Sequence, residues 1–156
     1  MVFSGAQVVA SGFFSSVGLM DHVTPAQQRK VLSLLAAFGA RALAAKSALA
    51  MSYGEFRKIL LLRALVHEPR LVTCDEPFDG LDAGSKADFT RALERVARDG
   101  TRLILVTHHP GDLPRCITHG LLLDKGRIVC QGGLAAVRAH PAMGRLYPEF
   151  RPVERA

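Results

Sequence analysis

Two short apolar runs, residues 70–74 and 101–107, lie on either side of a segment with helical periodicity. Each run has the length and apolar content of a buried parallel strand. Between them, residues 83–99 place Phe89 and Leu93 on one face of an amphipathic helix. Strand, helix and strand in this order form a crossover unit, which is right-handed in nearly all known cases. The sequence therefore predicts an α/β fold with a parallel sheet.

Helices are predicted on the N-terminal side of this unit. One is expected over residues 24–39, where a Thr-Pro pair suits the start and a Gly suits the end. The Ala-rich residues 41–50 are expected to form a second, short helix. Ser52 and Glu55 stand at capping-box spacing, so a third helix should begin there and stop before Pro69.

A β-hairpin is predicted after the second strand. Residues 120–132 are predicted to form its two strands, with the turn at Asp124–Gly126. A short helix over Leu134–His140 and a polar tail should follow.

The stretch from Val2 to Met20 carries no charge. Ser, Gly and Gln dilute it well below the apolar content of a membrane-spanning helix. It also lacks the basic start of a signal peptide and the Arg residues of a transit peptide. We expect a segment that is buried or covered by a partner, rather than an anchor.

Composition narrows the class of protein further. The chain has 156 residues and is 49% hydrophobic, enough for one domain with a core. Its three Cys lie far apart without a CxxC pair, which argues against a disulfide framework or a Cys-type zinc site and fits a reducing cytosol. The net charge of +6 comes mainly from scattered Arg, so we expect a solvated basic surface and no nucleic-acid partner.

Four local patterns follow one another in a fixed order: MSYGE at 51–55, LVTCDE at 71–76, GLDA at 80–83 and LVTHH at 105–109. Each pattern alone is weak, because an isolated Asp-Glu pair is commonly a surface turn and a Ser-Glu pair is commonly only a helix cap. Their order and spacing together are much more specific.

With these four patterns, the sequence resembles the ATP-binding cassette (ABC) ATPases from about residue 8 to residue 132. MSYGE is similar to the signature motif, usually written LSGGQ, and LVTCDE to Walker B. GLDA is similar to the D-loop, and His108 to the switch histidine. The SYG form of the signature is also similar to soluble photorepair or molybdenum-transport members of the superfamily.

The resemblance implies roles for four side chains at the catalytic end. Asp75 would hold Mg²⁺, mainly through water, since this ion prefers hard oxygen ligands. Glu76 would be the general base for the attacking water, and His108 would reach the γ-phosphate of ATP. Asp82 would contact the partner across a dimer interface. His109 is expected to be solvent-facing or structural.

The signature residues, by the same resemblance, would bind the ATP of the opposite subunit. Ser52 and the amides near Gly54 lie at a predicted helix N-terminus, which favours an anion. Two residues depart from the common motif: Tyr53 replaces a Gly, and Glu55 replaces a Gln. Glu55 puts a negative charge near the expected phosphate, unless it turns back to the Ser52 amide.

The phosphate-binding P-loop, GxxxxGK[ST], has no counterpart in this sequence. Lys46 is the only Lys followed by Ser or Thr, and both required Gly positions before it, 40 and 45, are Ala. Gln7 is no convincing Q-loop residue. The sequence therefore predicts a partial P-loop NTPase-type parallel sheet with a helical subdomain, without the N-terminal strands and P-loop.

Three parts are expected: a helical subdomain with the signature helix at about 1–69, the catalytic core strands at about 70–132, and a C-terminal helix and tail at 133–156. The implied function is the nucleotide-binding component of a transport-related system, present as an incomplete cassette. It would bind ATP and Mg²⁺ only when another segment or chain completes the site, and its own ATPase activity should be absent or very weak.

The expected partners are a second cassette chain and a membrane permease, with a cytoplasmic location peripheral to the inner face of the plasma membrane. The alternative is a non-enzymatic interaction module that docks on a complete cassette or on a P-loop-bearing partner. An exposed sheet edge would make such docking plausible. A small nucleic-acid binder rests on charge alone and ranks last.

Overall fold

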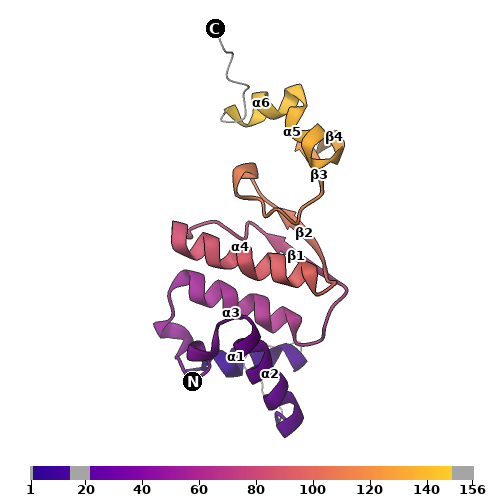
Figure 1. Cartoon of the computed structure of the whole chain (residues 1–156). Helices are drawn as coiled ribbons and strands as arrows, with labels where there is room; N and C mark the ends of the chain where they lie inside the picture. The colour runs from indigo at the N-terminus through magenta and orange to yellow at the C-terminus, as the bar shows by residue number, and fades with distance from the viewer. Residues whose placement is uncertain (1, 15–21, 149–156) are drawn as a thin grey trace. The chain divides into compact units, whose positions relative to one another are not determined.

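The computed structural model describes residues 2–14 and 22–148, which fall into two compact units, Met1–Pro114 and Arg115–Ala156 (Figure 1). Each unit is described by itself. Among the described residues, no helix has both the length and the apolar character that crossing a membrane requires.

The first unit begins with a group of helices in which α1 packs against both α2 and α3 (Figure 1). In chain order, these are α1 (Gly5–Ala10), η1 (Ser11–Phe14), α2 (Pro25–Ala37), η2 (Arg41–Leu43), η3 (Ala48–Ala50) and α3 (Tyr53–Leu65). α2 and α3 confirm the predicted helices at 24–39 and from Ser52 onward. Thr24 and Ser52 cap them through full capping boxes.

The predicted helix over residues 41–50 is wrong. Two separate single turns, η2 and η3, stand there instead. The backbone between them bonds to the N-terminal segment: the Gly5 amide donates to Lys46 O at 3.0 Å, and the Ala48 amide donates to Phe3 O at 2.8 Å. Groups that would close a helical ladder are therefore used in contacts distant in sequence.

The N-terminal segment is partly buried, as expected. Val9 is fully buried, and Ala10 and Ser11 are nearly so, whereas Val2 is exposed. A methyl group at Gly12 would come within 2.3 Å of Arg63 O in α3, so the two backbones approach closely. Residues 15–21 of the uncharged stretch lie outside the described residues.

The crossover unit consists of β1 (Leu71–Asp75), α4 (Ala83–Arg98) and β2 (Arg102–Val106). β1 and β2 pair in parallel, from Leu71 opposite Arg102 to Asp75 opposite Val106. This confirms the α/β class with a parallel sheet. α4 buries the face that carries Phe89 and Leu93, as its periodicity predicts.

The two faces of this sheet differ in burial. Val72, Leu103 and Leu105 point into the same hydrophobic core as α4. The alternate positions face away from it: Ile104 and Val106 are about half exposed, at 49% and 50%. One face of the sheet is therefore covered by this unit and the other is left open.

The second unit contains the predicted hairpin, β3 (His119–Asp124) and β4 (Arg127–Gly133), paired antiparallel. α5 (Leu134–Ala139) confirms the predicted short helix. The expected polar tail directly after it is wrong, because α6 (Pro141–Leu146) follows, with its first turn capped by His140. α6 supplies Ala142 and Met143 to a small core of its own unit.

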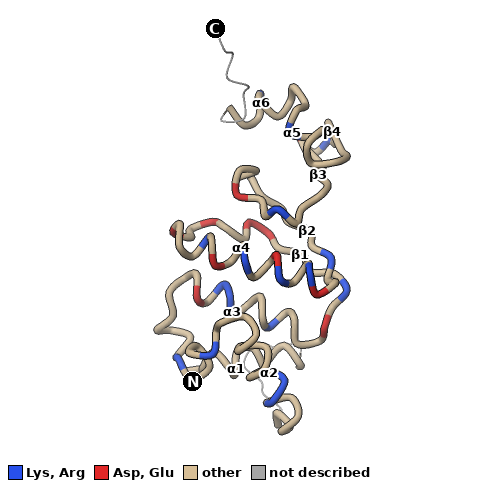
Figure 2. Tube along the Cα trace, in the orientation of Figure 1, with Lys and Arg blue, Asp and Glu red and all other residues tan. Residues whose placement is uncertain are grey.

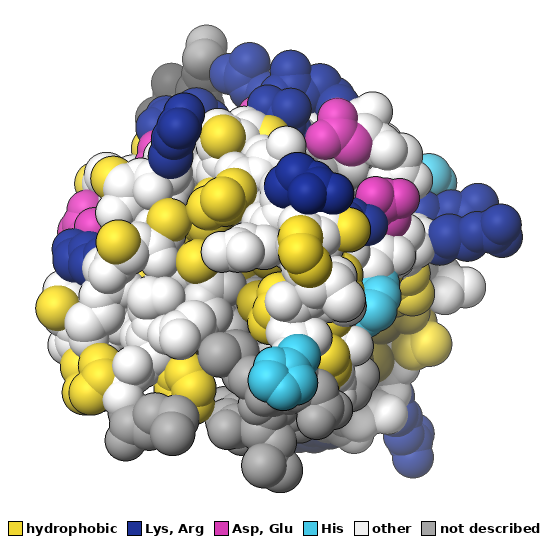
Figure 3. Space-filling view, turned by 90° about the horizontal axis from the view of Figure 1, so that it is seen from below, with side chains coloured by type: hydrophobic (Ala, Val, Ile, Leu, Met, Phe, Trp, Pro, Cys, Tyr) yellow, Lys and Arg dark blue, Asp and Glu magenta, His cyan; other side chains and the backbone are white. Residues whose placement is uncertain are grey.

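Basic and acidic positions are interspersed along α4, whereas the charged positions of α2 are both basic (Figure 2). A space-filling view of the end that carries α1 and α2 shows apolar groups interspersed with polar surface (Figure 3). Lys and Arg stand mostly towards the rim of that view. The basic charge is thus distributed over the surface, as the scattered Arg residues predict.

Candidate functional site

The carboxyl ends of β1 and β2 bring the Asp-Glu pair and the two His residues together. Asp75 ends β1, and Glu76 follows with φ 43°, in the left-handed region. The Glu76 amide donates to Val106 O, the last residue of β2, at 2.9 Å. This bond holds the exit of β1 against the exit of β2, where His108 begins the next loop.

The loop after Glu76 is anchored by its apolar residues. Pro77 and Phe78 are almost completely buried. The Phe78 ring meets that of Phe89 in α4 edge to face, at 6.0 Å between centroids. Aromatic pairs in this arrangement contribute beyond their buried area. The polar residues on either side of this anchor are therefore presented from a fixed loop.

Glu76 and His108 form a two-point contact. His108 Nδ1 lies 2.9 Å from Glu76 Oε1, and the His108 backbone amide donates to Glu76 Oε2 at 3.3 Å. Partial burial raises the pKa of the Glu76 carboxyl, but the hydrogen bonds from His108 lower it by more, so it lies below its ordinary value. The same contact raises the pKa of the His108 imidazole. In this arrangement both groups are stabilised in their charged forms.

Asp75 is exposed at the strand end. Among the described residues, no side chain makes a hydrogen bond or ion pair with its carboxylate. A free carboxylate oxygen that is open to solvent fits Mg²⁺, which is commonly held by one or two carboxylates and several waters. The donor chemistry of Asp75 therefore suits the role that the resemblance implies.

The signature residues form the N-terminus of α3. Ser52 Oγ accepts from the Glu55 amide at 3.2 Å, and Glu55 Oε2 accepts from the Ser52 amide at 2.8 Å. Lys46 Nζ also lies 2.7 Å from Glu55 Oε2. The hydrogen bond to Lys46, followed by that to Ser52, lowers the pKa of the Glu55 carboxyl. The charge of Glu55 is therefore paired with a cation of the same chain.

Lys46 itself does not stand in a phosphate-binding loop. It lies between η2 and η3, follows no strand, and holds Glu55. The chemistry of Asp75 and Glu76 therefore fits the magnesium and water side of an ATP site, whereas Lys46 is engaged with Glu55.

Two glycines allow the start of α3 to lie against the start of α4. A methyl group at Gly54 would come within 2.5 Å of Ser85 Oγ. Gly80 has φ +71°, and a methyl group there would lie 3.1 Å from the Tyr53 ring. The signature segment and the GLDA segment are thus neighbours within one chain.

Asp82 has a local structural role. It is the N-cap of α4: Oδ1 accepts from the Ser85 amide at 3.0 Å, and Oδ2 accepts from Ser85 Oγ at 2.6 Å. These bonds lower the pKa of the Asp82 carboxyl. Capping alone accounts for an Asp at this position, so the contact across a dimer stays a prediction.

Arg57 links α3 to the loop after β1, and the motifs gave no sign of this contact. Its guanidinium lies 4.8 Å from the centre of the Tyr53 ring and bonds to the Tyr53 hydroxyl. The same group donates to Glu76 O at 2.8 Å. The i,i+4 spacing of Tyr53 and Arg57 predicts their contact on a helix, but nothing in the sequence predicts the bond to Glu76.

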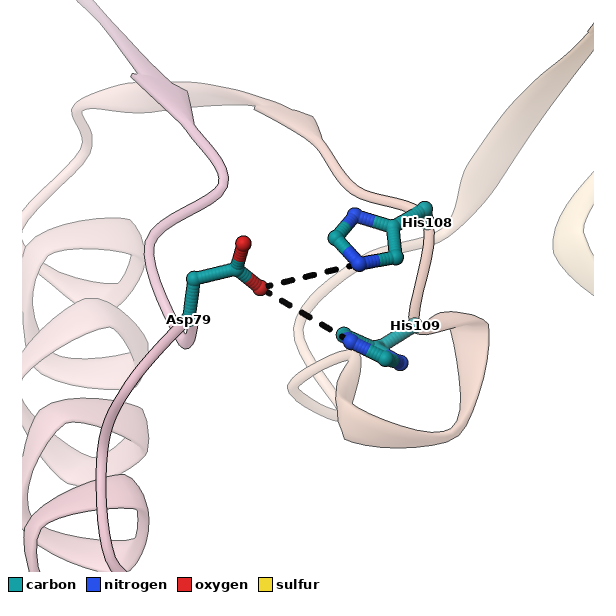
Figure 4. A group of neighbouring side chains, drawn as sticks. All are labelled: Asp79, His108 and His109. Carbon is teal, nitrogen blue, oxygen red and sulfur yellow. Dashed lines mark ion pairs between the residues drawn. The ribbon is translucent and has the colours of Figure 1, made fainter.

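Asp79 and His109 were not expected to take part in a site. His108 Nε2 and His109 Nε2 lie 3.9 and 3.8 Å from Asp79 Oδ1, and the two rings are 4.0 Å apart (Figure 4). His109 is half exposed, which agrees with its expected solvent-facing position. The pairing of two adjacent His with a carboxylate could be anticipated only if the loop after β1 was known to meet the loop after β2.

No protein-family model matches the sequence. Curated relatives are found among ABC transporters. The chain is 36% identical over 129 residues to the ABC transporter ATP-binding protein ModF of Escherichia coli, covering 81% of this chain and 25% of that protein. It is 34% identical over 115 residues to the molybdenum import ATP-binding protein ModC of Rhodopseudomonas palustris, covering 73% and 29%. The chain thus spans less than a third of either relative's length.

Solved cassettes have the same fold. A nucleotide-free ATP-binding cassette from an ABC transporter aligns with a TM-score of 0.80 at 17% identity, over 93% of this chain and 62% of the cassette. A dimeric bacterial ABC transporter cassette aligns with a TM-score of 0.66 at 20% identity, over 85% and 57%. The relatives and the shared fold agree with the four motifs in the sequence. The chain therefore belongs to the ABC ATPase family and covers about 60% of a cassette.

Proposed function

We propose that this chain is the C-terminal part of the nucleotide-binding component of an ABC transport system, with Asp75, Glu76 and His108 at the hydrolytic end of its site. The observation that carries the proposal is the two-point contact between Glu76 and His108 beside the free carboxylate of Asp75. An acid pair and a histidine at the ends of neighbouring parallel strands are the groups that phosphoryl transfer to water needs.

Each residue has a distinct task in this proposal. Asp75 would hold Mg²⁺ through water, and this ion supplies charge neutralisation at the phosphates when bound. Glu76 would orient the attacking water and accept its proton, for which a carboxylate kept ionised is suited. To do so, it must exchange at least part of its contact with His108 for the water. His108 would then be released towards the γ-phosphate.

The signature residues Ser52, Tyr53, Gly54 and Glu55 would meet the ATP of a second cassette chain, with Asp82 at the seam. ABC cassettes form dimers, as the dimeric bacterial cassette illustrates. The free side of Ser52 and the exposed Tyr53 ring are open for such a contact. A membrane permease would be the further partner, at the cytoplasmic face of the plasma membrane.

The proposal includes an incomplete site. The phosphate cradle would come from a segment or chain beyond this sequence, since Lys46 is committed to Glu55. Each charge-assisted hydrogen bond missing from the phosphates costs about 1.5–3 kcal/mol. Loss of several such bonds is enough to remove useful affinity for ATP.

Titration of Mg-ATP into the purified chain tests this proposal. We expect no micromolar binding and no steady turnover, whereas addition of a P-loop-bearing segment of a related cassette should restore hydrolysis. Glu76→Gln should abolish the restored activity, because the amide cannot take the proton. Micromolar binding by the chain alone, with turnover that Glu76→Gln abolishes, would refute the incompleteness. Restored turnover that Glu76→Gln leaves intact would refute the role of Glu76.

The second candidate is a non-enzymatic module that docks on a P-loop-bearing partner. It is favoured by the open face of the β1–β2 sheet, where Leu71, Ile104 and Val106 are about half exposed. Each of the two paired strands also leaves its outer edge without a strand partner among the described residues. This function would be favoured if the ATPase rate of such a partner changed on binding the chain, and changed by the same factor on binding the Glu76→Gln variant.

A further inference from the structure

The contact of Asp79 with the two histidines has the composition of a transition-metal site. One carboxylate oxygen and two imidazole nitrogens face one another, and these three atoms all lie within 4.8 Å of one another (Figure 4). Zinc takes such ligands at about 2.0–2.2 Å, which places tetrahedral neighbours roughly 3.3 Å apart. Distances of 3.8 and 3.9 Å from Asp79 Oδ1 are therefore close to what a bound ion would require.

The side chains can close this gap at little cost. The side chains of His108 and His109 are 56% and 50% exposed, and that of Asp79 is 39% exposed. None of the three is clamped by a packed core, so small rotations can bring the donors onto one ion. Their exposure also gives an ion and one or more waters direct access from solvent.

The backbone that carries the two imidazoles is nevertheless fixed. The His108 amide donates to Glu76 Oε2, and the His109 amide donates to Thr107 Oγ1 at 2.9 Å. His109 O in turn accepts from the Asp112 amide at 3.0 Å. Two neighbouring ligands on a held backbone lose less freedom on binding an ion than two ligands on a mobile loop.

Glu76 supplies the outer partner that metal-binding histidines characteristically have. A ligating imidazole usually donates its second N–H to a carboxylate, which fixes the tautomer and the ring orientation. His108 Nδ1 lies 2.9 Å from Glu76 Oε1, while Nε2 of the same ring faces Asp79. The Glu76 carboxylate, the His108 imidazole and the expected ion position thus already follow one another in the required order without an ion.

The charge of the neighbouring side chains also favours a transition-metal cation at this position. Asp79 and Glu76 are both acidic, so two carboxylates meet the two imidazoles. Two nitrogen donors and one oxygen donor suit Zn²⁺ and its neighbours in the series better than Mg²⁺, which prefers oxygen alone. None of the ligands is a cysteine, so the scattered Cys residues say nothing against this site.

We infer that Asp79, His108 and His109 form a binding site for one zinc-class divalent ion, with Glu76 positioning His108 from behind. Three protein ligands leave at least one coordination position to water, as in open zinc sites. The ion site is distinct in chemistry from the magnesium position proposed at Asp75. An ion on His108 Nε2 would also keep that nitrogen from any other ligand, including a phosphate.

The test is competition for Zn²⁺ between the reduced, purified chain and a chromophoric chelator, without nucleotide. We expect one bound ion at micromolar or tighter affinity, undisturbed by excess Mg²⁺. His109→Ala and Asp79→Asn should each weaken binding at least about tenfold through loss of a ligand. Glu76→Ala should weaken it by about 10–100-fold through loss of the outer carboxylate. Because no ATP is present, failure here leaves the proposed function untouched.

His119→Ala is the matched control, because His119 is another exposed His that lies outside the cluster. It should bind Zn²⁺ as the parent does, and thermal melts without metal should show that all variants fold. Co²⁺ gives a second readout: the visible spectrum should show N and O ligation without a thiolate charge-transfer band. No binding, binding that His109→Ala and Asp79→Asn leave unchanged, or a thiolate band would overturn the site.

Discussion

At the residue scale, Glu76 is one of three non-glycine residues with positive φ among the described residues, together with Glu68 and Lys125. A non-glycine residue in the left-handed region is held there only when its surroundings determine it. Here the Glu76 amide bonds to Val106 O, its carbonyl accepts from Arg57, and its carboxylate meets His108. All three polar groups of this one residue are used. The geometry of the loop after β1 thus depends on contacts from a strand, a helix and a second loop.

Arg57→Ala tests the contribution of the helix. The change removes the bond to Glu76 O and the cation–π contact with Tyr53, so we expect a loss of about 1–2 kcal/mol in the free energy of unfolding. Urea unfolding of the purified chain measures it. Arg91→Ala is the matched control, because the Arg91 pair with Asp88 on α4 is largely exposed and should be worth under about 0.5 kcal/mol. Equal losses in the two variants would contradict a special role of Arg57.

Glu55 is the second residue whose charge is determined locally. Its carboxylate closes the capping box of α3 and pairs with Lys46. A Gln at this position keeps an oxygen for the Ser52 amide but loses the charge. The difference in unfolding free energy between the parent and Glu55→Gln therefore measures the ion pair separately from the cap.

This difference should depend on pH. Because Lys46 holds the pKa of Glu55 below its ordinary value, the stabilisation is complete above the unfolded-state pKa, and it is lost as the pH falls through the lower folded-state pKa. At pH 7 we expect the free energy of unfolding of the parent to exceed that of Glu55→Gln by about 0.5 kcal/mol. The value is small because the ion pair is partly solvated. The two should converge in strong acid.

Denaturant unfolding at pH 7 and in acid measures the effect, and Lys46→Met supplies the control background. With Lys46 replaced, Glu55→Gln should cost much less at pH 7, as a double-mutant cycle requires. A cost that stays the same without Lys46 would assign the effect to the cap and not to the pair.

At the element scale, the sequence predicted what is encoded locally. α2, α3 and α4 have capping residues at their starts and apolar residues at helical spacing, and all three helices are present. The parallel pairing of β1 and β2 followed from two apolar runs and the helix between them. In these elements, local preference and tertiary structure agree.

The predictions that failed depend on contacts distant in sequence. Residues 41–50 have helical composition, but their backbone bonds to residues 3–6 and breaks into two turns. α6 was missed because the segment is too short for its apolar residues to show helical periodicity. Its position is determined by packing on α5. Propensity is a weak prior wherever such packing decides.

The candidate site shows the same division. Asp75, Glu76 and His108 could be singled out because they stand in ordered motifs that resemble those of the ABC ATPases. Arg57, Asp79 and His109 could not, since their roles come from the path of two loops in space. Sequence motifs therefore gave the groups expected from the family, whereas the structure added the side chains that hold or extend them.

At the scale of the whole molecule, the described residues form two units with separate cores. The first unit contains every candidate site residue, and among its described residues the sheet has two strands. A two-stranded parallel sheet with one face open is unusual, since parallel sheets are normally covered on both faces. The related cassettes are longer than this chain, and the part it does not span is the natural candidate to cover the open face.

Ile104→Gln tests whether that face is an interface. Ile104 is 49% exposed and lies away from the core, so the change should alter the stability of the chain itself by less than about 0.5 kcal/mol. It should, however, weaken association with a P-loop-bearing segment of a related cassette by tenfold or more, because burying a Gln amide without a partner costs about 1–3 kcal/mol. Unfolding curves and a binding titration give the two values.

Leu93→Ala is the matching control, because it should lower the stability of the chain without changing the open face of the sheet. Leu93 is fully buried on the inner face of α4, so its truncation should cost about 2–5 kcal/mol of folding stability through the cavity it leaves. At temperatures where this variant is still folded, its association with the same segment should be unchanged. If instead Ile104→Gln destabilised the chain as Leu93→Ala does, the open face would be part of the folded core. If it changed neither stability nor association, the covering segment would pack elsewhere, and a phosphate cradle supplied by that segment would not approach from this side of the sheet.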